Sequence, residues 1–210
     1  MARLWDISQP IRPGVPTWPG DTVYQAEKTW ALEGDCPVNV SKITLSTHTG
    51  AHADAPLHYD ASGAAIDQVD LSRYIGPCRV FDFRGGRGLI EPEDLGGLQE
   101  ACRPRVLLRT FERFPHDAWP TEFATPSPAL IDALADKGVV LIGTDAPSMD
   151  PETSKTLDTH HAIRRRGLSI LEGLVLDDVP AGDYELIALP LPFQGLDASP
   201  VRAVLRELAA

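Results

Sequence analysis

Residues 48–58 constrain the fold more than any other part of the chain. They read HTGAHADAPLH and place three of the six histidines and one aspartate in the pattern H-x3-H-x-D-x3-H. Pro56 argues against a helix through this segment, because proline has no amide donor and disfavours the helical conformation at the preceding residue. Gly50 allows the backbone to turn tightly between the first two histidines. We therefore expect a strand that ends in a loop and gathers these side chains.

The spacing of these residues is typical of a metal site. Neutral imidazoles and a carboxylate form a borderline-hard ligand set suited to zinc or manganese. A divalent ion held in this way can activate a water molecule at neutral pH. The candidate ligands in this segment are His48, His52 and Asp54. The alternative is a histidine-rich surface loop, since such tracts can reflect composition alone.

A second group of candidate ligands lies closer to the end of the sequence. Glu172 interrupts the apolar run LSILEGL of residues 168–174, and a buried carboxylate needs a partner. That partner is either an arginine or a metal ion, and the nearby pair His160 and His161 strengthens the metal interpretation. Adjacent side chains point in different directions on a regular backbone, so we expect only one of these two histidines to be a ligand.

Charge and cysteine content exclude several classes of protein. The chain has 30 acidic and 19 basic side chains, a formal net charge of -11, whereas nucleic-acid binding requires concentrated lysine and arginine. Cys36, Cys78 and Cys102 form no CxxC motif, so neither a disulfide framework nor a thiolate zinc site is indicated. Reduced thiols in a cytoplasmic protein are the simplest account. We also expect no signal peptide and no association with membranes.

Strand patterns outnumber helix patterns, and the helix patterns are scattered between the strands. No internal repeat or linker divides the chain, so we expect one mixed α/β domain over residues 1–210. No GxGxxG, GxxxxGK[ST] or GxSxG motif supports a nucleotide cofactor or a serine hydrolase. Helices are expected from Pro92 towards Cys102 and over 127–135. Strands are expected at 4–8, 38–46 (half-buried and leading to His48), 78–83, 106–108, 139–142, 168–171, 174–176, 184–189 and 200–208. For residues 200–208 the alternative is a helix capped at Ser199-Pro200, but the alternation of Val201, Ala203 and Leu205 favours a strand.

Short motifs along nearly the whole chain carry a resemblance to a known family. The segment at residues 48–58 also fits the pattern H-x-G-x-H-x-D-x-P-x-H. With the accompanying motifs, the chain resembles the bacterial kynurenine formamidases (arylformamidases) of the cyclase-like metal-dependent hydrolase family. The histidine pattern indicates the broad family, and TWPGD narrows it to the formamidases. The accompanying motifs are LWDIS at 4–8, TWPGD at 17–21, YIGPC at 74–78, LIGTD at 141–145, ILEGL at 170–174 and GDYEL at 182–186.

The resemblance implies a fold, an assembly and a reaction. The fold is the swivelling β/β/α type, the assembly is a homodimer, and each subunit holds two divalent metal ions, usually zinc, with manganese as the alternative. His48, His52 and Asp54 are implied as ligands of the first ion. Asp54 and Glu172 are implied to bridge to the second ion, which His160 completes. The implied reaction is hydrolysis of N-formyl-L-kynurenine to L-kynurenine and formate, a step of tryptophan breakdown.

Two further residues receive roles from the resemblance, His58 as proton donor and acceptor and Trp18 as a contact to the substrate. An aromatic amine leaves more easily when it is protonated, and an indole can stack on a flat ring. The alternatives are that His58 is a fourth ligand or bonds to backbone, and that Trp18 packs in the core. Asp145 and Ser148 either orient a ligand or belong to a turn at Pro147, so neither is assigned a role.

The sequence leaves two other functions open. A related metal hydrolase that opens a cyclic amide such as isatin would share the metal ligands and differ in its aromatic pocket. A metal-binding or small-molecule-binding protein without catalysis is disfavoured, because the chain retains His58 together with Asp54 and Glu172. We therefore expect an enzyme that acts on a small aryl formamide.

Overall fold

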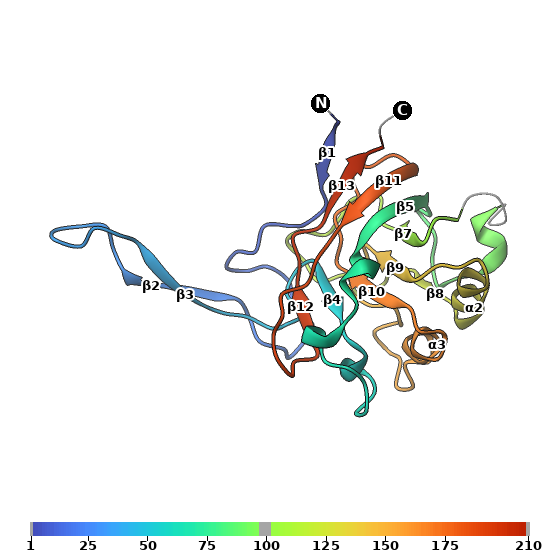
Figure 1. Cartoon of the computed structure of the whole chain (residues 1–210), viewed down its shortest axis with the longest axis horizontal. Helices are drawn as coiled ribbons and strands as arrows, with labels where there is room; N and C mark the ends of the chain where they lie inside the picture. Colours follow the sequence, from blue (N-terminus) through green and yellow to red (C-terminus); the bar gives the residue numbers. More distant parts are fainter. Residues whose placement is uncertain (1, 97–101, 209–210) are drawn as a thin grey trace.

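A mixed β-sheet runs through the body of the molecule (Figure 1). The structure is a computed structural model that describes residues 2–96 and 102–208, and within them nine strands form this sheet. The four central strands are parallel to one another, and all other neighbouring pairs are antiparallel. In spatial order the strands are β1 (Leu4–Asp6), β13 (Val204–Glu207), β11 (Gly182–Ile187), β5 (Ile75–Asp82), β7 (Arg105–Arg109), β9 (Leu141–Thr144), β10 (Ser169–Glu172), β4 (His52–Asp54) and β12 (Ala198–Pro200).

The centre of the sheet is buried on both faces. Strands β7, β9 and β10 contain buried residues only, which explains their almost continuous apolar sequences. Leu107 and Leu171 point into one apolar cluster, whereas Val106 and Ile170 point into a second cluster on the opposite face. Alternate side chains of one strand therefore enter two separate halves of the core. The mixed α/β fold expected from the sequence is confirmed.

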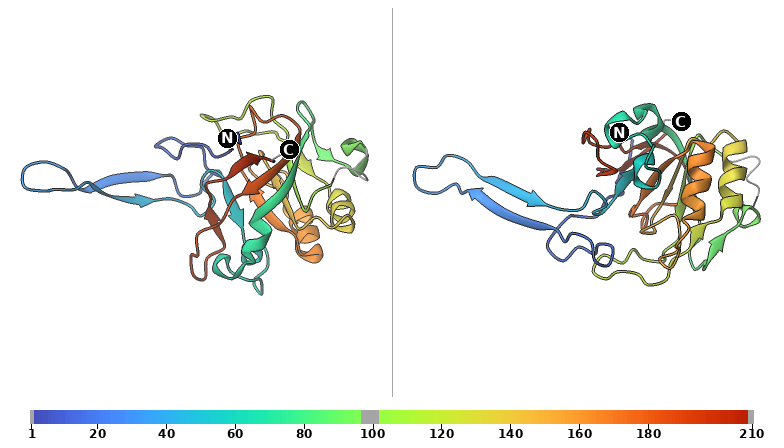
Figure 2. Two further views of the ribbon diagram at one scale, coloured as in Figure 1. Left: turned by 45° about the horizontal axis from the view of Figure 1, so that its top comes forward. Right: turned by 90° about the horizontal axis from the view of Figure 1, so that it is seen from below.

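Helices α2 (Pro128–Asp136) and α3 (Asp158–Arg166) lie side by side and cover one face of the sheet (Figure 2). The helix expected at residues 127–135 is confirmed as α2. Ser127 caps it by accepting a hydrogen bond from the amide of Leu130 at 3.0 Å, and Pro128 begins it. Among the described residues, no helix combines the length and the apolar character that a membrane span requires.

Short elements complete the fold and correct two expectations. The helix expected from Pro92 is a single 3-10 turn as far as the structure describes it, and its continuation over 97–101 lies outside the described residues. The strand expected at 174–176 is wrong, because these residues form a buried connection without strand pairing. The remaining elements are η1 (Pro56–His58), η2 (Ile66–Gln68), η3 (Leu71–Tyr74), η4 (Pro92–Leu95), β6 (Leu89–Ile90) and β8 (Thr125–Pro126).

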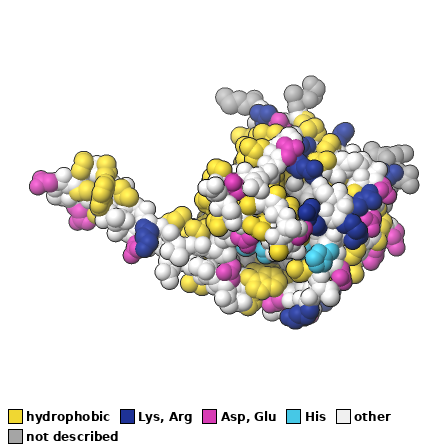
Figure 3. Space-filling view, turned by 60° about the horizontal axis from the view of Figure 1, so that its bottom comes forward, with side chains coloured by type: hydrophobic (Ala, Val, Ile, Leu, Met, Phe, Trp, Pro, Cys, Tyr) yellow, Lys and Arg dark blue, Asp and Glu magenta, His cyan; other side chains and the backbone are white. Residues whose placement is uncertain are grey.

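Strands β2 (Gln25–Trp30) and β3 (Val40–Thr44) form an antiparallel hairpin that projects from the body (Figures 1 and 2). We call residues 25–44 the arm. The strand expected at 38–46 is present as β3, but its expected half-burial is wrong, since every residue of both strands is exposed. Hydrophobic side chains lie open along the arm (Figure 3), with Trp30 and Ile43 each 57% exposed. Polar residues do separate the apolar ones along this segment, but no other element of the described residues packs against its apolar face.

Candidate metal centre

Strands β4 and β10 together place three of the candidate ligands on one face of the sheet. His52 and Asp54 are two residues apart on this strand, so their side chains point the same way. Glu172 is the last residue of the neighbouring strand β10 and lies directly opposite His52 in the antiparallel register. Sheet pairing therefore brings together two residues from the histidine motif and a glutamate far from them in sequence.

Two histidines from other elements complete this arrangement. His48 lies in the turn that leads into β4, and His160 lies in the first turn of α3. His161, the adjacent residue, is exposed to solvent, so only one of the two histidines reaches the sheet. We call the five residues brought together in this way the ligand cluster, which consists of His48, His52, Asp54, His160 and Glu172.

The inner nitrogens of the three histidines surround the two carboxylates. His48 Nδ1 lies 3.1 Å from Asp54 Oδ1. His52 Nε2 lies 3.4 Å from oxygens of both Asp54 and Glu172. His160 Nε2 lies 3.7 Å from Asp54 and 3.6 Å from Glu172. Asp54 and Glu172 therefore sit between the histidines, as residues that bridge two cations must.

The outer nitrogens of the same histidines are held by other groups. His52 Nδ1 donates to the backbone oxygen of Gly50 at 2.9 Å, and this oxygen can only accept. His48 Nε2 and His160 Nδ1 donate to the carboxylates of Asp197 and Asp150 at 2.9 and 2.6 Å. Each bond keeps a proton on the outer nitrogen, so the inner nitrogen is the one available to a cation. The three rings are thus oriented for coordination.

Asp150 has a second task that explains the position of His160. Its two carboxylate oxygens accept hydrogen bonds from the amides of Thr159 and His160, both at 3.0 Å. These amides belong to the first turn of α3, where backbone donors have no partner within the helix. The carboxylate of Asp150 therefore caps α3 and orients the ring of His160 at the same time.

Several buried atoms of the ligand cluster have no hydrogen-bond partner among the described residues. They are His52 Nε2, His160 Nε2 and both carboxylate oxygens of Asp54. Each buried polar atom left in this state costs about 1–3 kcal/mol. A divalent cation would satisfy all of them, and imidazole nitrogens with carboxylate oxygens are donors suited to zinc or manganese. The residues therefore fit a metal centre.

The pKa shifts in the cluster show that its carboxylates favour positively charged neighbours. Burial raises the pKa of Asp54, but contacts with His160 and His48 outweigh it and hold the pKa well below the usual range. Burial lowers the pKa of His48, but the contact with Asp54 and the hydrogen bond to Asp197 outweigh it and raise the pKa to about 10. In the metal-free protein, protons thus occupy positions that a cation would take.

The partners of Glu172 are two histidines and a backbone amide. Its nearest charged contacts within the described residues are His52 and His160, and no arginine forms an ion pair with it. The amide of Met149 also donates to Glu172 Oε1 at 2.8 Å. Burial and the nearby Asp54 raise the pKa of Glu172, but the contacts with His160 and His52 outweigh them and lower it. The carboxylate is therefore ionised within the cluster.

His58 lies at the exposed edge of the cluster. Its side chain is 33% exposed, and its ring centroid is 4.3 Å from that of His48 and 6.0 Å from that of His160. One ring nitrogen, Nδ1, lies 3.4 Å from Asp197 Oδ2. The position is compatible with either role considered from the sequence, proton transfer or coordination.

A cavity of about 310 Å³ opens onto the ligand cluster. Trp18 lies in its wall and is 38% exposed, so it is not a core residue. Its ring packs edge to face against Trp119, with centroids 5.3 Å apart. Phe111 and Phe114 line the same cavity. The metal centre therefore faces a space with aromatic walls.

Asp145 and Ser148 support this region through the backbone. Asp145 is buried and accepts hydrogen bonds from the amides of Thr110 and Phe111 at 2.9 and 3.0 Å. Burial raises the pKa of Asp145 to about 6, although these hydrogen bonds oppose the shift. The hydroxyl of Ser148 accepts from the amide of Asp150 at 3.2 Å. Ser148 thus takes part in a local turn, as one of the two interpretations of the sequence expected, whereas Asp145 binds a loop distant in sequence.

Sequence reasoning missed Asp150, Asp197 and Trp119. Asp150 follows the strand β9 by a few residues, in the same segment as Asp145, and this placement was the available signal. Asp197 and Trp119 lie in irregular segments, and nothing in their local sequence indicates that they approach a histidine or another tryptophan. Their contacts arise from the sheet order and the long loops alone.

Comparison with known proteins gives consistent results. The Cyclase family model, described as "Putative cyclase", matches residues 5–151. A solved structure named "potential metal-dependent hydrolase with cyclase activity" is 32% identical, covers 100% of both chains and has a TM-score of 0.85. A "predicted metal-dependent hydrolase" from Bacillus stearothermophilus is 31% identical over 99% of this chain and 100% of its own, with a TM-score of 0.84.

A more distant structure shares the fold. Isatin hydrolase A from Labrenzia aggregata, bound to benzyl benzoate, is 22% identical, with 98% of this chain and 93% of its own covered and a TM-score of 0.84. At this level of identity the likeness extends to the arrangement of strands and helices. The ligand cluster and the aromatic cavity described above are properties of the present chain.

Proposed function

Since the chain belongs to the cyclase family, in which its relatives are metal-dependent hydrolases, we propose that it is an arylformamidase. The proposed reaction is hydrolysis of N-formyl-L-kynurenine to L-kynurenine and formate, in the breakdown of tryptophan. One observation carries the proposal above all, the aromatic cavity that opens directly onto the ligand cluster. It offers a flat ring a binding surface beside a metal centre.

The ligand cluster would hold two divalent ions. His48, His52 and Asp54 would hold the first, and His160 and Glu172 the second, with the two carboxylates between them. When bound, such ions polarise the formyl oxygen and make water a better nucleophile at neutral pH. The residues of the chain supply orientation, because each histidine has its outer nitrogen fixed by a hydrogen bond.

The residues around the cluster provide binding and proton transfer. Trp18 would stack on the aromatic ring of the substrate, which places the formyl group towards the cluster. His58, at the edge of the cluster and in the wall of the cavity, would transfer a proton to the departing amine nitrogen. Each role belongs to a residue that the cavity exposes.

Hydrolysis of a cyclic amide such as isatin is the alternative. Isatin hydrolases share the fold of this chain, and a bicyclic aromatic amide also suits an aromatic cavity. The two reactions differ in the fate of the nitrogen, because ring opening leaves the amine attached to the product. A formamidase must instead release two separate products.

We also propose that the protein is a cytoplasmic homodimer that binds neither nucleic acid nor membrane. The net charge of -11 disfavours contact with a phosphate backbone. Exposed apolar side chains such as Trp30 and Ile43 on the arm are typical of surfaces that contact another protein. Light scattering at micromolar concentration is expected to give the mass of two chains, and the mass of one chain would contradict the proposal.

A steady-state assay of N-formylkynurenine beside isatin, with metal content measured on the same sample, tests the proposed reaction. We expect hydrolysis of the formamide, loss of activity with a chelator and recovery on addition of zinc or manganese. Preferential hydrolysis of isatin would favour the alternative. Metal-loaded protein that hydrolyses neither compound would show that the substrate is a different one.

A further inference from the structure

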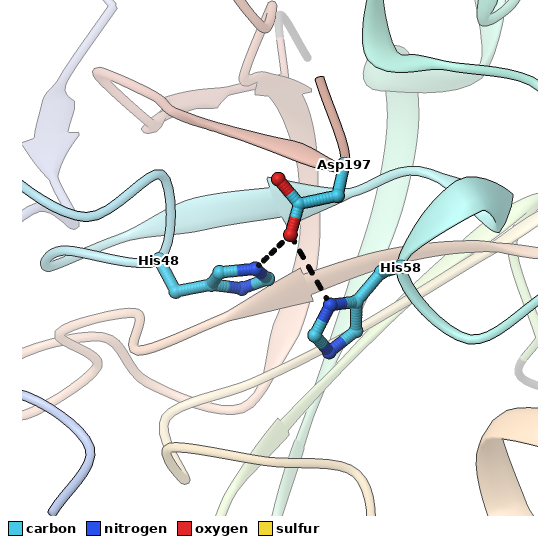
Figure 4. A group of neighbouring side chains, drawn as sticks. All are labelled: His48, His58 and Asp197. Atoms are coloured by element: carbon cyan, nitrogen blue, oxygen red, sulfur yellow. Dashed lines mark hydrogen bonds and ion pairs between the residues drawn. The ribbon is translucent and has the colours of Figure 1, made fainter. Parts of the chain in front are cut away.

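Asp197 lies between a candidate metal ligand and the candidate proton-transfer residue (Figure 4). Its Oδ2 atom accepts a hydrogen bond from His48 Nε2 at 2.9 Å and lies 3.4 Å from His58 Nδ1. Its Oδ1 atom accepts from the hydroxyl of Thr47 at 3.1 Å. A single carboxylate oxygen thus faces two imidazole rings, and its two lone pairs allow it to accept from both.

The sheet fixes the backbone of Asp197 beside the ligand cluster. Asp197 immediately precedes β12, which pairs with β4 so that Ala198 lies opposite Asp54. The backbone oxygen of Asp197 accepts a hydrogen bond from the amide of Ala55 at 2.8 Å. Backbone pairing therefore holds Asp197 next to β4, the strand that carries His52 and Asp54, although Asp197 is far from that strand in sequence.

We propose that Asp197 is a positioning residue that orients both His48 and His58 for the reaction. The inference rests on the proposed function, because it gives Asp197 a part in proton transfer as well as in metal binding. It assigns one side chain to two histidines that sequence reasoning treated separately.

The two contacts have different consequences. A hydrogen bond from His48 Nε2 leaves Nδ1, which lies 3.1 Å from Asp54, as the nitrogen that would bind the first metal ion. The contact with His58 Nδ1 leaves Nε2 on the far side of the ring from Asp197 (Figure 4), in a residue that lines the cavity. That nitrogen is then free to exchange a proton with a bound substrate.

The Asp197→Asn variant separates these consequences. The amide keeps the size of the side chain but loses the charge and one of the two acceptor oxygens. We expect metal affinity to fall about 10-fold to 100-fold, because groups that orient a metal-bound histidine have effects of this size. At saturating metal, we expect kcat to fall about 10-fold or more with little change in KM, because ring binding does not involve Asp197.

Asp67→Ala provides a control in the same region, because alanine removes the acceptor that an asparagine amide oxygen would keep. Asp67 accepts a hydrogen bond from the amide of Gly195 at 3.0 Å and so ties down the loop that precedes Asp197. Its loss disturbs the loop and leaves the carboxylate next to the histidines in place. We expect near wild-type metal affinity and kcat, whereas equal losses in both variants would show that only loop structure matters.

A double-mutant comparison with His58→Ala completes the test. If Asp197 acts on turnover through His58, Asp197→Asn should reduce kcat no further in the His58→Ala background. Additive losses, or wild-type metal affinity and kcat in Asp197→Asn, would overturn the inference. The kcat measurements use whichever of N-formylkynurenine and isatin the wild-type protein hydrolyses. Metal titration needs no substrate, so it tests the contact with His48 even if both compounds fail.

Discussion

Each histidine of the ligand cluster uses its two ring nitrogens for different purposes. The outer nitrogen of His48, His52 or His160 donates to a carboxylate or a carbonyl, and the inner nitrogen faces Asp54 or Glu172. His58 departs from this pattern, because it lies at the exposed edge and no ion pair links it to Asp54 or Glu172 among the described residues. This difference between the residues suggests different outcomes on substitution.

Alanine substitutions at His58 and Asp54 should have distinct effects. We expect His58→Ala to reduce kcat by about 10²-fold to 10⁴-fold, the usual contribution of a proton-transfer residue, with metal still bound. Asp54→Ala should lose metal as well as activity, because Asp54 contacts all three histidines of the cluster. Elemental analysis and kinetics on the same samples check this. Equal loss of metal in both variants would make His58 a ligand.

Replacement of Trp18 should weaken the use of aromatic substrates. One stacking contact contributes about 0.5–1.5 kcal/mol beyond area burial, so Trp18→Ala should lower kcat/KM for N-formylkynurenine several-fold to about tenfold. Metal content should stay unchanged, since the indole lies in the cavity wall and away from the cluster carboxylates. A small non-aromatic formamide serves as the control substrate. If kcat/KM falls equally for both substrates, Trp18 does not contact the aromatic ring.

The sequence predicted the cluster residues because they share a dense motif or occur in an unusual apolar context. Glu172 could be singled out because a carboxylate within an apolar strand requires a partner. Asp197 and Asp150 could not be predicted in the same way, because their roles depend on contacts made across the fold. A carboxylate in a polar loop looks the same in sequence whether it faces solvent or an imidazole ring.

Helix α3 shows at the level of elements why one part of the fold was not predicted. Its sequence, DTHHAIRRR, has few apolar residues and a basic end, so the helical period of apolar residues is weak. The residue before it, Leu157, is not a capping residue, and Asp150 supplies the cap from outside the helix. The local signals that remain are the aspartate in the first turn, the arginines of the last turn and Gly167 after it.

The strands were easier to predict than their surroundings. Buried strands such as β7, β9 and β10 have compact apolar sequences that depend little on distant residues. Strand β3 has the same alternating pattern but lies in the exposed arm. The pattern of one strand indicates that it has an apolar face, whereas its burial depends on what packs against that face. Local sequence contains only the first kind of information.

The contact between the end of β10 and the turn before β4 predicts a sensitive position. Gly173 has a φ angle of +63°, and a Cβ atom there would lie 2.6 Å from the backbone oxygen of Gly50. That oxygen accepts the hydrogen bond from His52 Nδ1. Gly173→Ala should therefore destabilise the protein and weaken metal binding together, because the strain reaches a ligand through the backbone.

Gly138→Ala is the matched control for this prediction. Gly138 has a similar φ angle of +83°, but no heavy atom lies within 4 Å of a Cβ at this position. We expect a loss of about 1–2 kcal/mol from the left-handed backbone alone, with unchanged metal affinity. Urea unfolding of both metal-free variants, with metal titration, measures the difference. Similar results for both glycines would show that the contact with Gly50 has little effect.

For the whole molecule, stability should depend on pH and metal together. Burial lowers the pKa of His48, but contacts with Asp54 and Asp197 raise it from 6.5 to about 10 in the metal-free protein. Because the folded pKa exceeds the unfolded one, protonated His48 stabilises the metal-free protein below the unfolded pKa. This contribution is lost as the pH rises through the folded pKa. A metal ion displaces the same proton, so metal affinity should rise between the unfolded pKa of 6.5 and the folded pKa of about 10.

Thermal unfolding with and without zinc checks this expectation. Between about pH 6.5 and pH 10, we expect the Tm of chelator-treated protein to fall relative to that of zinc-loaded protein. The gap between the two Tm values should therefore widen as the pH rises. A gap that stays constant or narrows with rising pH would contradict the assignment of His48 as a ligand that exchanges a proton for a metal.

The pairing of β4 with β12 has a consequence for synthesis on the ribosome. Residues 48–58 leave the exit tunnel early, yet Asp197 and β12 reach their side of β4 only after most of the chain has been translated. Pairing over so long a sequence separation is slow compared with local contacts. A nascent chain thus displays the candidate ligand histidines before their full environment exists. If the proposed metal centre forms, binding of the metal in its final geometry is a late event that follows translation of β12.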